Sequence, residues 1–125
     1  MNKKERKSLV PPLDMCLMIP KKKFRDTYFA WVPRFRGNGS FRKIVYYELL
    51  LRPSIDSQCV PAPTLEEIMD ALVCRTNEPC VQWNGGWYVS GDRLNGDGRP
   101  ETHDSVSSVT AAMKLYLELE EDKKC

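Results

Sequence analysis

The sequence lacks the spacing patterns by which small metal-binding and disulfide-rich proteins are recognised. Its five cysteines are odd in number and irregularly placed, and no two of them form a C-x-x-C pair. Neither a disulfide framework nor a zinc site follows from such spacing. We therefore predict reduced thiols in a cytoplasmic protein, with no bound metal and no cofactor.

Histidine and long apolar runs are also scarce. His103 is the single histidine, so a catalytic arrangement that needs an imidazole must use it. It lies beside Asp104 before an expected helix, where turn formation and capping explain both residues. No glycine-rich phosphate loop lies between a strand and a helix. The apolar run at residues 9–19 contains two prolines and an aspartate and is too short to span a bilayer, so we expect no membrane contact.

The remaining composition is typical of one folded domain. The chain has 125 residues, of which 42% are hydrophobic and 29% charged. A chain of this length forms a single core of ordinary size. We predict that residues 9–122 form one domain, preceded by a disordered tail at residues 1–8 that carries four basic side chains.

Charge is distributed unevenly along the chain. Residues 1–52 hold thirteen Lys and Arg against four Asp and Glu, whereas residues 53–125 hold six against thirteen. Either the two halves attract each other within one folded surface, or the basic half faces a polyanion. The first alternative is the more common, because local charge imbalance is frequent and exposed ion pairs contribute little.

The clearest local signal is a capped helix at residues 65–73. Thr64 and Glu67 have the spacing of a capping box, in which each side chain binds the backbone N–H of the other residue. Leu65, Ile68 and Leu72 then repeat with the period of a helix and form one apolar face.

Two antiparallel hairpins are expected around this helix. Residues 24–32 and 41–51 are rich in aromatic and β-branched residues and are separated by a glycine-rich turn at 37–40. Pro33 is expected to end the first strand or to form a bulge. The second strand is apolar on both sides near its end, which predicts a central strand or one covered on both faces.

The second hairpin turns at residues 84–86. A three-residue loop with a left-handed glycine places Trp83 opposite Trp87 and Val81 opposite Val89, with all four on one face. A two-residue turn would instead pair Trp83 with Tyr88. We prefer the first register because it separates apolar from polar side chains more cleanly.

The C-terminal part is predicted to be a polar loop followed by a helix. Residues 91–104 contain three glycines and a proline and are expected to be loop. Asp104 or Ser105 then caps a helix at residues 106–121. Its apolar stripe comprises Val106, Val109, Ala112, Met113, Tyr116 and Leu119. The predicted fold class is α+β, an antiparallel sheet of about four strands with the helices 65–73 and 106–121 packed on one face.

Two groups of side chains are candidates for binding. Basic and aromatic residues together around the first hairpin can contact phosphates and unpaired bases. The basic candidates are Lys21, Lys22, Lys23, Arg25, Arg34, Arg36, Arg42 and Lys43. The candidates for a protein interface are Trp83, Trp87 and Tyr88.

Parts of the sequence resemble two groups of small proteins. Segment 61–67 (PAPTLEE), with the strand before it, segment 86–89 (GWYV) and an Ala- and Leu-rich final helix, resembles uncharacterised phage, prophage and mobile-element proteins of gut bacteria. Segments 86–89 and 115–118 (LYLE) are also similar to antitoxin domains of the HicB type, although a glycine-rich loop replaces strands of that family. The resemblance implies an α+β fold and a mobile-element origin, and it assigns no site residues.

Together these features predict a non-enzymatic accessory protein that binds another macromolecule. A protein partner, including a second copy of the chain, ranks first. Nucleic acid bound by the basic hairpin and tail is the alternative. An enzyme that uses His103 is third.

Overall fold

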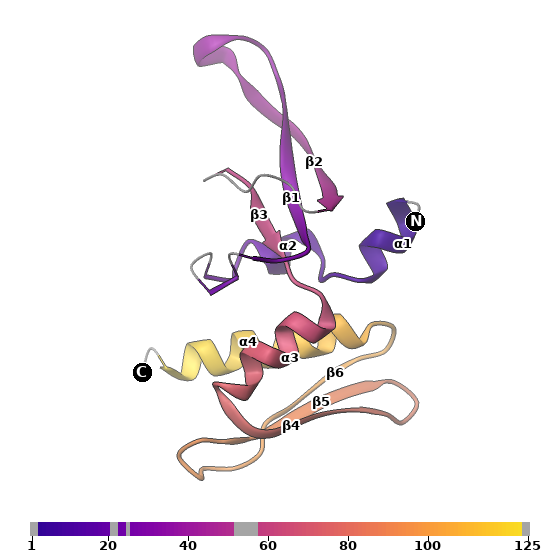
Figure 1. Cartoon of the computed structure of the whole chain (residues 1–125), viewed down its shortest axis with the longest axis vertical. Coiled ribbons are helices and arrows are strands. Elements are labelled where there is room, and N and C mark those ends of the chain that lie inside the picture. The colour runs from indigo at the N-terminus through magenta and orange to yellow at the C-terminus, as the bar shows by residue number, and fades with distance from the viewer. Residues whose placement is uncertain (1–2, 21–22, 25, 52–57, 124–125) are drawn as a thin grey trace.

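The computed structural model describes residues 3–20, 23–24, 26–51 and 58–123 and has an α+β architecture (Figure 1). It contains two antiparallel sheets of three strands, with the strand orders β2-β1-β3 and β4-β5-β6. The α+β class is therefore confirmed. The expected single sheet of about four strands is corrected to two separate sheets, because no strand of the first hairpin pairs with a strand of the second among the described residues.

The first sheet belongs to the N-terminal half. Its elements are α1 (Lys3–Ser8), α2 (Leu13–Cys16), β1 (Phe29–Arg36), β2 (Lys43–Leu51) and β3 (Val60–Ala62). Helix α1 contributes no buried residue, whereas α2 buries Cys16. The buried residues of this first core are Val10, Cys16, Phe29, Trp31, Leu49, Val60 and Ala62.

The prediction for the strand pair was right in topology and wrong in its bounds. Strand β1 begins five residues later than expected and continues through Pro33, which lies opposite Tyr47. Proline is tolerated there because the pairing with β3 stops at Trp31, so that beyond this point β1 pairs with β2 alone among the described residues. Strand β2 is an edge strand, not a central one, and residues 43–46 are all exposed. Its apolar composition therefore does not reflect burial on both faces.

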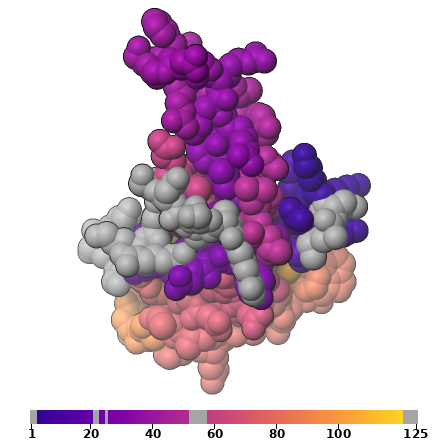
Figure 2. All heavy atoms as spheres, turned by 45° about the horizontal axis from the view of Figure 1, so that its top comes forward, coloured from indigo at the N-terminus to yellow at the C-terminus, as the bar shows by residue number. Residues whose placement is uncertain are grey.

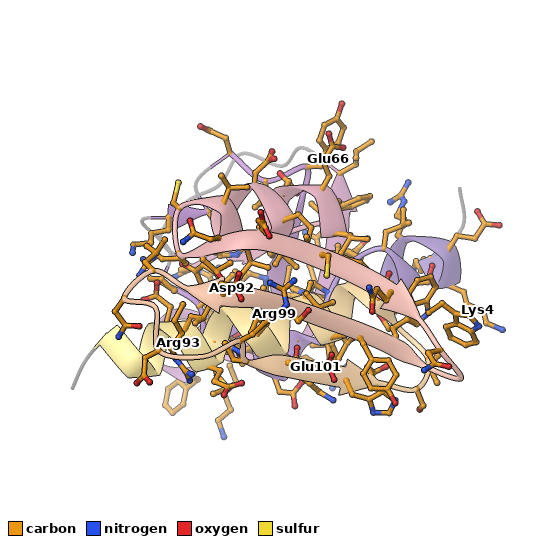
Figure 3. All side chains as sticks on the ribbon, turned by 90° about the horizontal axis from the view of Figure 1, so that it is seen from below. Lys4, Glu66, Asp92, Arg93, Arg99 and Glu101 are labelled. Atoms are coloured by element: carbon orange, nitrogen blue, oxygen red, sulfur yellow. The ribbon has the colours of Figure 1, made fainter. Side chains whose placement is uncertain are left out.

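The second sheet carries both long helices on one face. Its elements are α3 (Leu65–Val73), β4 (Thr76–Trp83), β5 (Trp87–Arg93), β6 (Glu101–Asp104) and α4 (Ser108–Lys123). Helix α4 packs on β5 and β6, and α3 packs on α4 and β4 (Figure 1). The other face of this sheet has no helix on it (Figure 3). The expected packing of two helices on one face is thus found, on this sheet alone.

Two local predictions are confirmed residue by residue. Thr64 and Glu67 form the capping box, and α3 has the expected bounds. The second hairpin adopts the three-residue loop, with Trp83 opposite Trp87 and Val81 opposite Val89. Gly85 has a φ of 71° and supplies the left-handed residue that this turn requires.

The prediction of a loop at residues 91–104 was wrong at both ends. Strand β5 extends to Arg93, and β6 occupies residues 101–104. Thr102 fixes β6 in place because its hydroxyl donates to the carbonyl of Ala111 in α4 at 2.6 Å. A contact of this kind between two elements leaves no signal in the local sequence.

The last helix begins later than expected. The Asp104 carboxylate accepts from the N–H groups of Val106 and Ser107, which forms a turn before the helix. Ser107 then accepts from the N–H of Thr110, and α4 starts at Ser108. Val106 lies in the turn and is 83% exposed, so its assignment to the apolar stripe was wrong, whereas the other five stripe residues are buried.

The segment between α2 and β1 contributes to the second core. Ile19 and Phe24 are buried with the residues of α3 and α4, and the ring of Phe24 meets that of Tyr116 edge-on at 5.2 Å. Lys23 forms an ion pair with Glu120 of α4 at 3.3 Å. The N-terminal segment is thus fastened to the C-terminal helices. Among the described residues, no helix combines the length and apolar composition that crossing a bilayer requires.

Candidate functional site

The outer half of the first hairpin projects from the rest of the molecule (Figures 1 and 2). We define residues 33–46 as the arm; it contains the ends of β1 and β2 and the short 3-10 helix η2 (Gly39–Phe41) that joins them. Residues 36–46 are all exposed. No helix packs on the arm in Figure 1, so the exposed side chains of residues 36–46 are accessible to a partner.

Four basic side chains lie on the arm. Arg36 and Lys43 are directly opposite each other in the strand register, next to the turn. Arg42 places its guanidinium 3.6 Å from the centroid of the Phe35 ring. Arg34, nearer the base, is the exception in being paired, to Glu48 at 2.9 Å. Arg36 and Lys43 have no anionic partner among the described residues.

An open groove runs along the arm. It has a volume of about 630 Å³, and its lining includes Arg34, Arg36, Arg42, Tyr46 and Gln58. Strand β3 is only three residues long, and among the described residues no strand pairs with this edge of β1 beyond Trp31, where the groove lies. Three of the four basic side chains of the arm therefore line a single concave surface.

Tyr46 is a member of this surface that the sequence did not indicate. It lies opposite Arg34 in the register and is 57% exposed. Cross-strand neighbours share a face of the sheet, so the tyrosine ring is on the same side as the Arg34 guanidinium. The pairing of Tyr46 with Arg34 follows from the strand register, and the register shifts at a bulge between Arg34 and Phe35 that the sequence does not reveal.

The other basic candidates do not extend this patch. Lys23 is engaged with Glu120 on α4. Lys21, Lys22 and Arg25 lie outside the described residues. The structure thus brings together Arg34, Arg36, Arg42 and Lys43 and places Lys23 elsewhere.

The three aromatic candidates divide between two faces of the second sheet. Trp83 is 61% exposed, and its ring meets that of the partly buried Trp87 edge-on at 5.1 Å. Tyr88 points to the opposite face, where its ring lies 4.6 Å from that of His103. Trp83 and Trp87 form one patch, and Tyr88 does not belong to it.

The open face of the second sheet carries a polar cluster that sequence reasoning missed. The Arg99 guanidinium lies 3.2 Å from the sulfur of Cys80 and 3.1 Å from Asp92 (Figure 3). Cys80 is also 3.4 Å from the Ser90 hydroxyl. The hydrogen bond with Ser90, and the adjacent Arg99, hold the pKa of the Cys80 thiol below its ordinary value.

Among the described residues, those suited to catalysis or metal binding are dispersed. Cys80 interacts with Ser90 and Arg99, whereas His103 stacks on Tyr88, so the imidazole and the thiol belong to different groups. Cys74 is exposed at the end of α3. Within the part of the chain that the structure describes, no three His, Cys, Asp or Glu side chains are placed to share a metal ion.

No family model matches the chain, no curated protein matches its sequence, and no solved structure matches it.

Proposed function

We propose that the protein binds nucleic acid through the arm. The supporting observation is the projection of a two-stranded ribbon on which four basic and no acidic residues occur between Pro33 and Tyr46. The carboxylate of Glu48 pairs with Arg34. The exposed arm thus presents a concentrated positive charge, which is the electrostatic feature that attracts a phosphate backbone.

The position of the charge supports nucleic acid ahead of the protein partner that ranked first from sequence. The alternative was that the arginines pair with the acidic C-terminal half. In the structure that half pairs instead with Lys23, Arg75, Arg99 and Lys114. Among the described residues Arg36 and Lys43 of the arm have no carboxylate partner, and a polyanion is the partner that would neutralise them. A cytoplasmic setting, as expected for a mobile-element accessory protein with reduced thiols, fits this role.

Fluorescence anisotropy with labelled oligonucleotides tests the proposal. The parent chain is expected to bind at low salt, with an affinity that falls steeply as salt rises because counterions are released from the phosphates. The double variant Arg36→Ala/Lys43→Ala should bind about tenfold more weakly, with a salt slope shallower by about 2. Circular dichroism confirms that the variant is folded.

A charge-matched control separates the arm from net charge. The double variant Arg93→Ala/Lys114→Ala removes the same two charges from the second sheet and α4 and should bind like the parent. Equal weakening by both variants would show that the arm is not the site. Absence of binding at tens of micromolar protein in low salt would remove the proposed function.

A second candidate function rests on Trp83. A tryptophan that is 61% exposed and braced by Trp87 resembles the anchors of protein interfaces. We propose self-association through this patch as the simplest case. In sedimentation velocity the parent should associate with rising concentration and Trp83→Ser should not. If both are monomeric throughout, the patch does not join two copies.

A further inference from the structure

The basic side chains of the arm lie on both of its faces. Successive residues of a strand point to opposite sides, so Arg34 and Arg36 share one face of β1 and Phe35 occupies the other. Lys43 is opposite Arg36 in the register and joins the first face. The guanidinium of Arg42 lies over the Phe35 ring, on the second face. The tip of the arm is therefore cationic on two sides.

Charge on two faces fits a ligand that surrounds the arm with phosphates. The outside of a double helix would contact one face and leave the other unused. A groove of a duplex has a sugar-phosphate backbone on each wall. The groove of about 630 Å³ is lined by Arg34, Arg36 and Arg42 and would give one backbone a concave surface to follow. Lys43, on β2, is not part of this lining and would face the other wall.

We infer that the arm enters the major groove of double-stranded DNA with Phe41 foremost. This inference rests on the proposed function and specifies its ligand. The major groove of B-DNA is about 12 Å wide and admits a two-stranded ribbon, whereas the minor groove, about 6 Å wide, is too narrow. The major groove of an RNA duplex is deep and narrow and excludes the same ribbon.

Phe41 is the side chain that would reach the bases. It ends the 3-10 turn at the tip and is 80% exposed, although a phenyl ring is normally buried. The backbone of Gly37 lies close to that of Phe41 across the turn: a Cβ at Gly37 would lie 2.5 Å from the carbonyl oxygen of Phe41. In the major groove an apolar ring finds the C5-methyl group of thymine.

The aromatic rings are not arranged as a platform for unpaired bases. Such a platform needs several rings open on one face. Here the Phe35 ring is covered by Arg42, and Tyr46 lies opposite Arg34 on the other face. Binding to single strands is therefore expected to be the weaker mode.

Four labelled probes of one mixed sequence test the inference by anisotropy with the full chain. They are a 20-base-pair DNA duplex, its single strand, the matching RNA duplex, and the DNA duplex with uracil in place of thymine. The DNA duplex should bind about tenfold more tightly than the single strand and the RNA duplex. Loss of the thymine methyl groups, which lie in the major groove, should weaken binding about threefold.

Two variants assign the contact to Phe41. Phe41→Ala should weaken binding to the DNA duplex about fivefold to tenfold and should no longer distinguish thymine from uracil. Val106→Ala removes an apolar side chain that is 83% exposed and far along the chain from the arm, and should bind like the parent. Both variants remain folded because neither site is buried.

The outcomes separate this inference from the proposed function. Equal or tighter binding of the single strand or of the RNA duplex would overturn groove entry while leaving the arm as a nucleic-acid site. If neither Phe41→Ala nor the exchange of thymine for uracil changes the affinity for the DNA duplex, Phe41 does not contact the bases in the major groove. Failure to bind any probe would remove the proposed function and the inference together.

Discussion

The carboxylate of Glu67 accepts a hydrogen bond from the backbone N–H of Tyr28 at 3.1 Å, across 39 positions of the chain. Its other oxygen accepts from the N–H of Thr64 at 2.9 Å and completes the cap of α3. One side chain therefore both starts the helix and ties it to the segment that leads into β1.

This double role predicts a large cost for losing Glu67. Glu67→Ala removes the partners of two backbone donors and should lower the free energy of unfolding by about 2 kcal/mol. Glu66→Ala is the matched control, because it removes an acidic residue from the same first turn and should cost less than about 0.5 kcal/mol. Urea denaturation measures both, and similar losses for the two variants would contradict the double role.

The close packing of Gly91 against Thr76 predicts a steric effect. A Cβ at Gly91 would lie 2.5 Å from the Thr76 hydroxyl oxygen and 2.7 Å from its methyl carbon. Gly91→Ala should therefore destabilise the fold by about 1–3 kcal/mol. Combining it with Thr76→Ala should cost less than the two single changes added together, because the two closest clashing atoms are then removed. If the free-energy losses of the two single variants add up to that of the double variant in thermal or urea unfolding, the two residues are not in steric contact.

The cluster around Cys80 predicts a pH-dependent reactivity. The hydrogen bond with Ser90 and the nearby Arg99 lower the pKa of Cys80, so more thiolate is present at a given pH. Burial raises the pKa of Cys16 to about 12, so Cys16 should not react in the folded protein. Alkylation by iodoacetamide, followed by mass spectrometry between pH 6 and pH 9, measures each site.

Replacing Arg99 isolates its part in this effect. Arg99→Gln should move the midpoint of Cys80 alkylation to higher pH. Arg93→Gln removes an equal charge from the same sheet, where Arg93 binds the carbonyl of Asp97, and should leave the midpoint in place. An unchanged midpoint in Arg99→Gln would mean that the guanidinium does not stabilise the thiolate.

The turn before α4 predicts a loss of stability in acid. Burial raises the pKa of Asp104, but the N–H groups of Ser107 and Val106 and the ion pair with Lys114 lower it by more. A lowered pKa in the folded state stabilises the protein above about pH 4, the value of an unfolded aspartate, and this contribution is lost as pH falls further.

The variant Asp104→Asn tests this pH window. It should be less stable than the parent at pH 7 by a few tenths to about 1 kcal/mol, and equal to it near pH 2. Asp97→Asn, in the exposed loop before β6, should match the parent at both values. A difference between parent and Asp104→Asn that persists unchanged at pH 2 would rule out the carboxylate charge as its cause.

The features that sequence predicted are those in which neighbouring residues determine the structure. The Thr64 and Glu67 cap needs only three residues of spacing, and the Trp83–Trp87 register follows from one left-handed glycine. The split into two sheets depends instead on which strand edges meet. Strand β6 pairs with β5 and is held to α4 by the hydrogen bond from Thr102 to Ala111, and β1 continues past Pro33 where its pairing with β3 has stopped. Such pairings between distant residues have no local signature.

The candidate site was predicted in part for the same reason. The turn at residues 37–40 and the four basic residues around it were recognisable from sequence. Their projection as a free arm was not, because it depends on where the first core ends, at Trp31 and Leu49. The second-half cluster of Cys80, Ser90 and Arg99 brings together three separate segments, and no spacing rule would have grouped them.

The placement of Ile19 and Phe24 has a practical consequence for cutting the chain. A fragment that starts at Thr64 would contain every strand of the second sheet yet would lack two of its buried side chains, leaving the Tyr116 ring uncovered on one side. Such a fragment should aggregate through its exposed apolar surface and be easily digested by proteases. Dissection of the molecule therefore has to begin upstream of Ile19 or to supply a substitute for this leading segment.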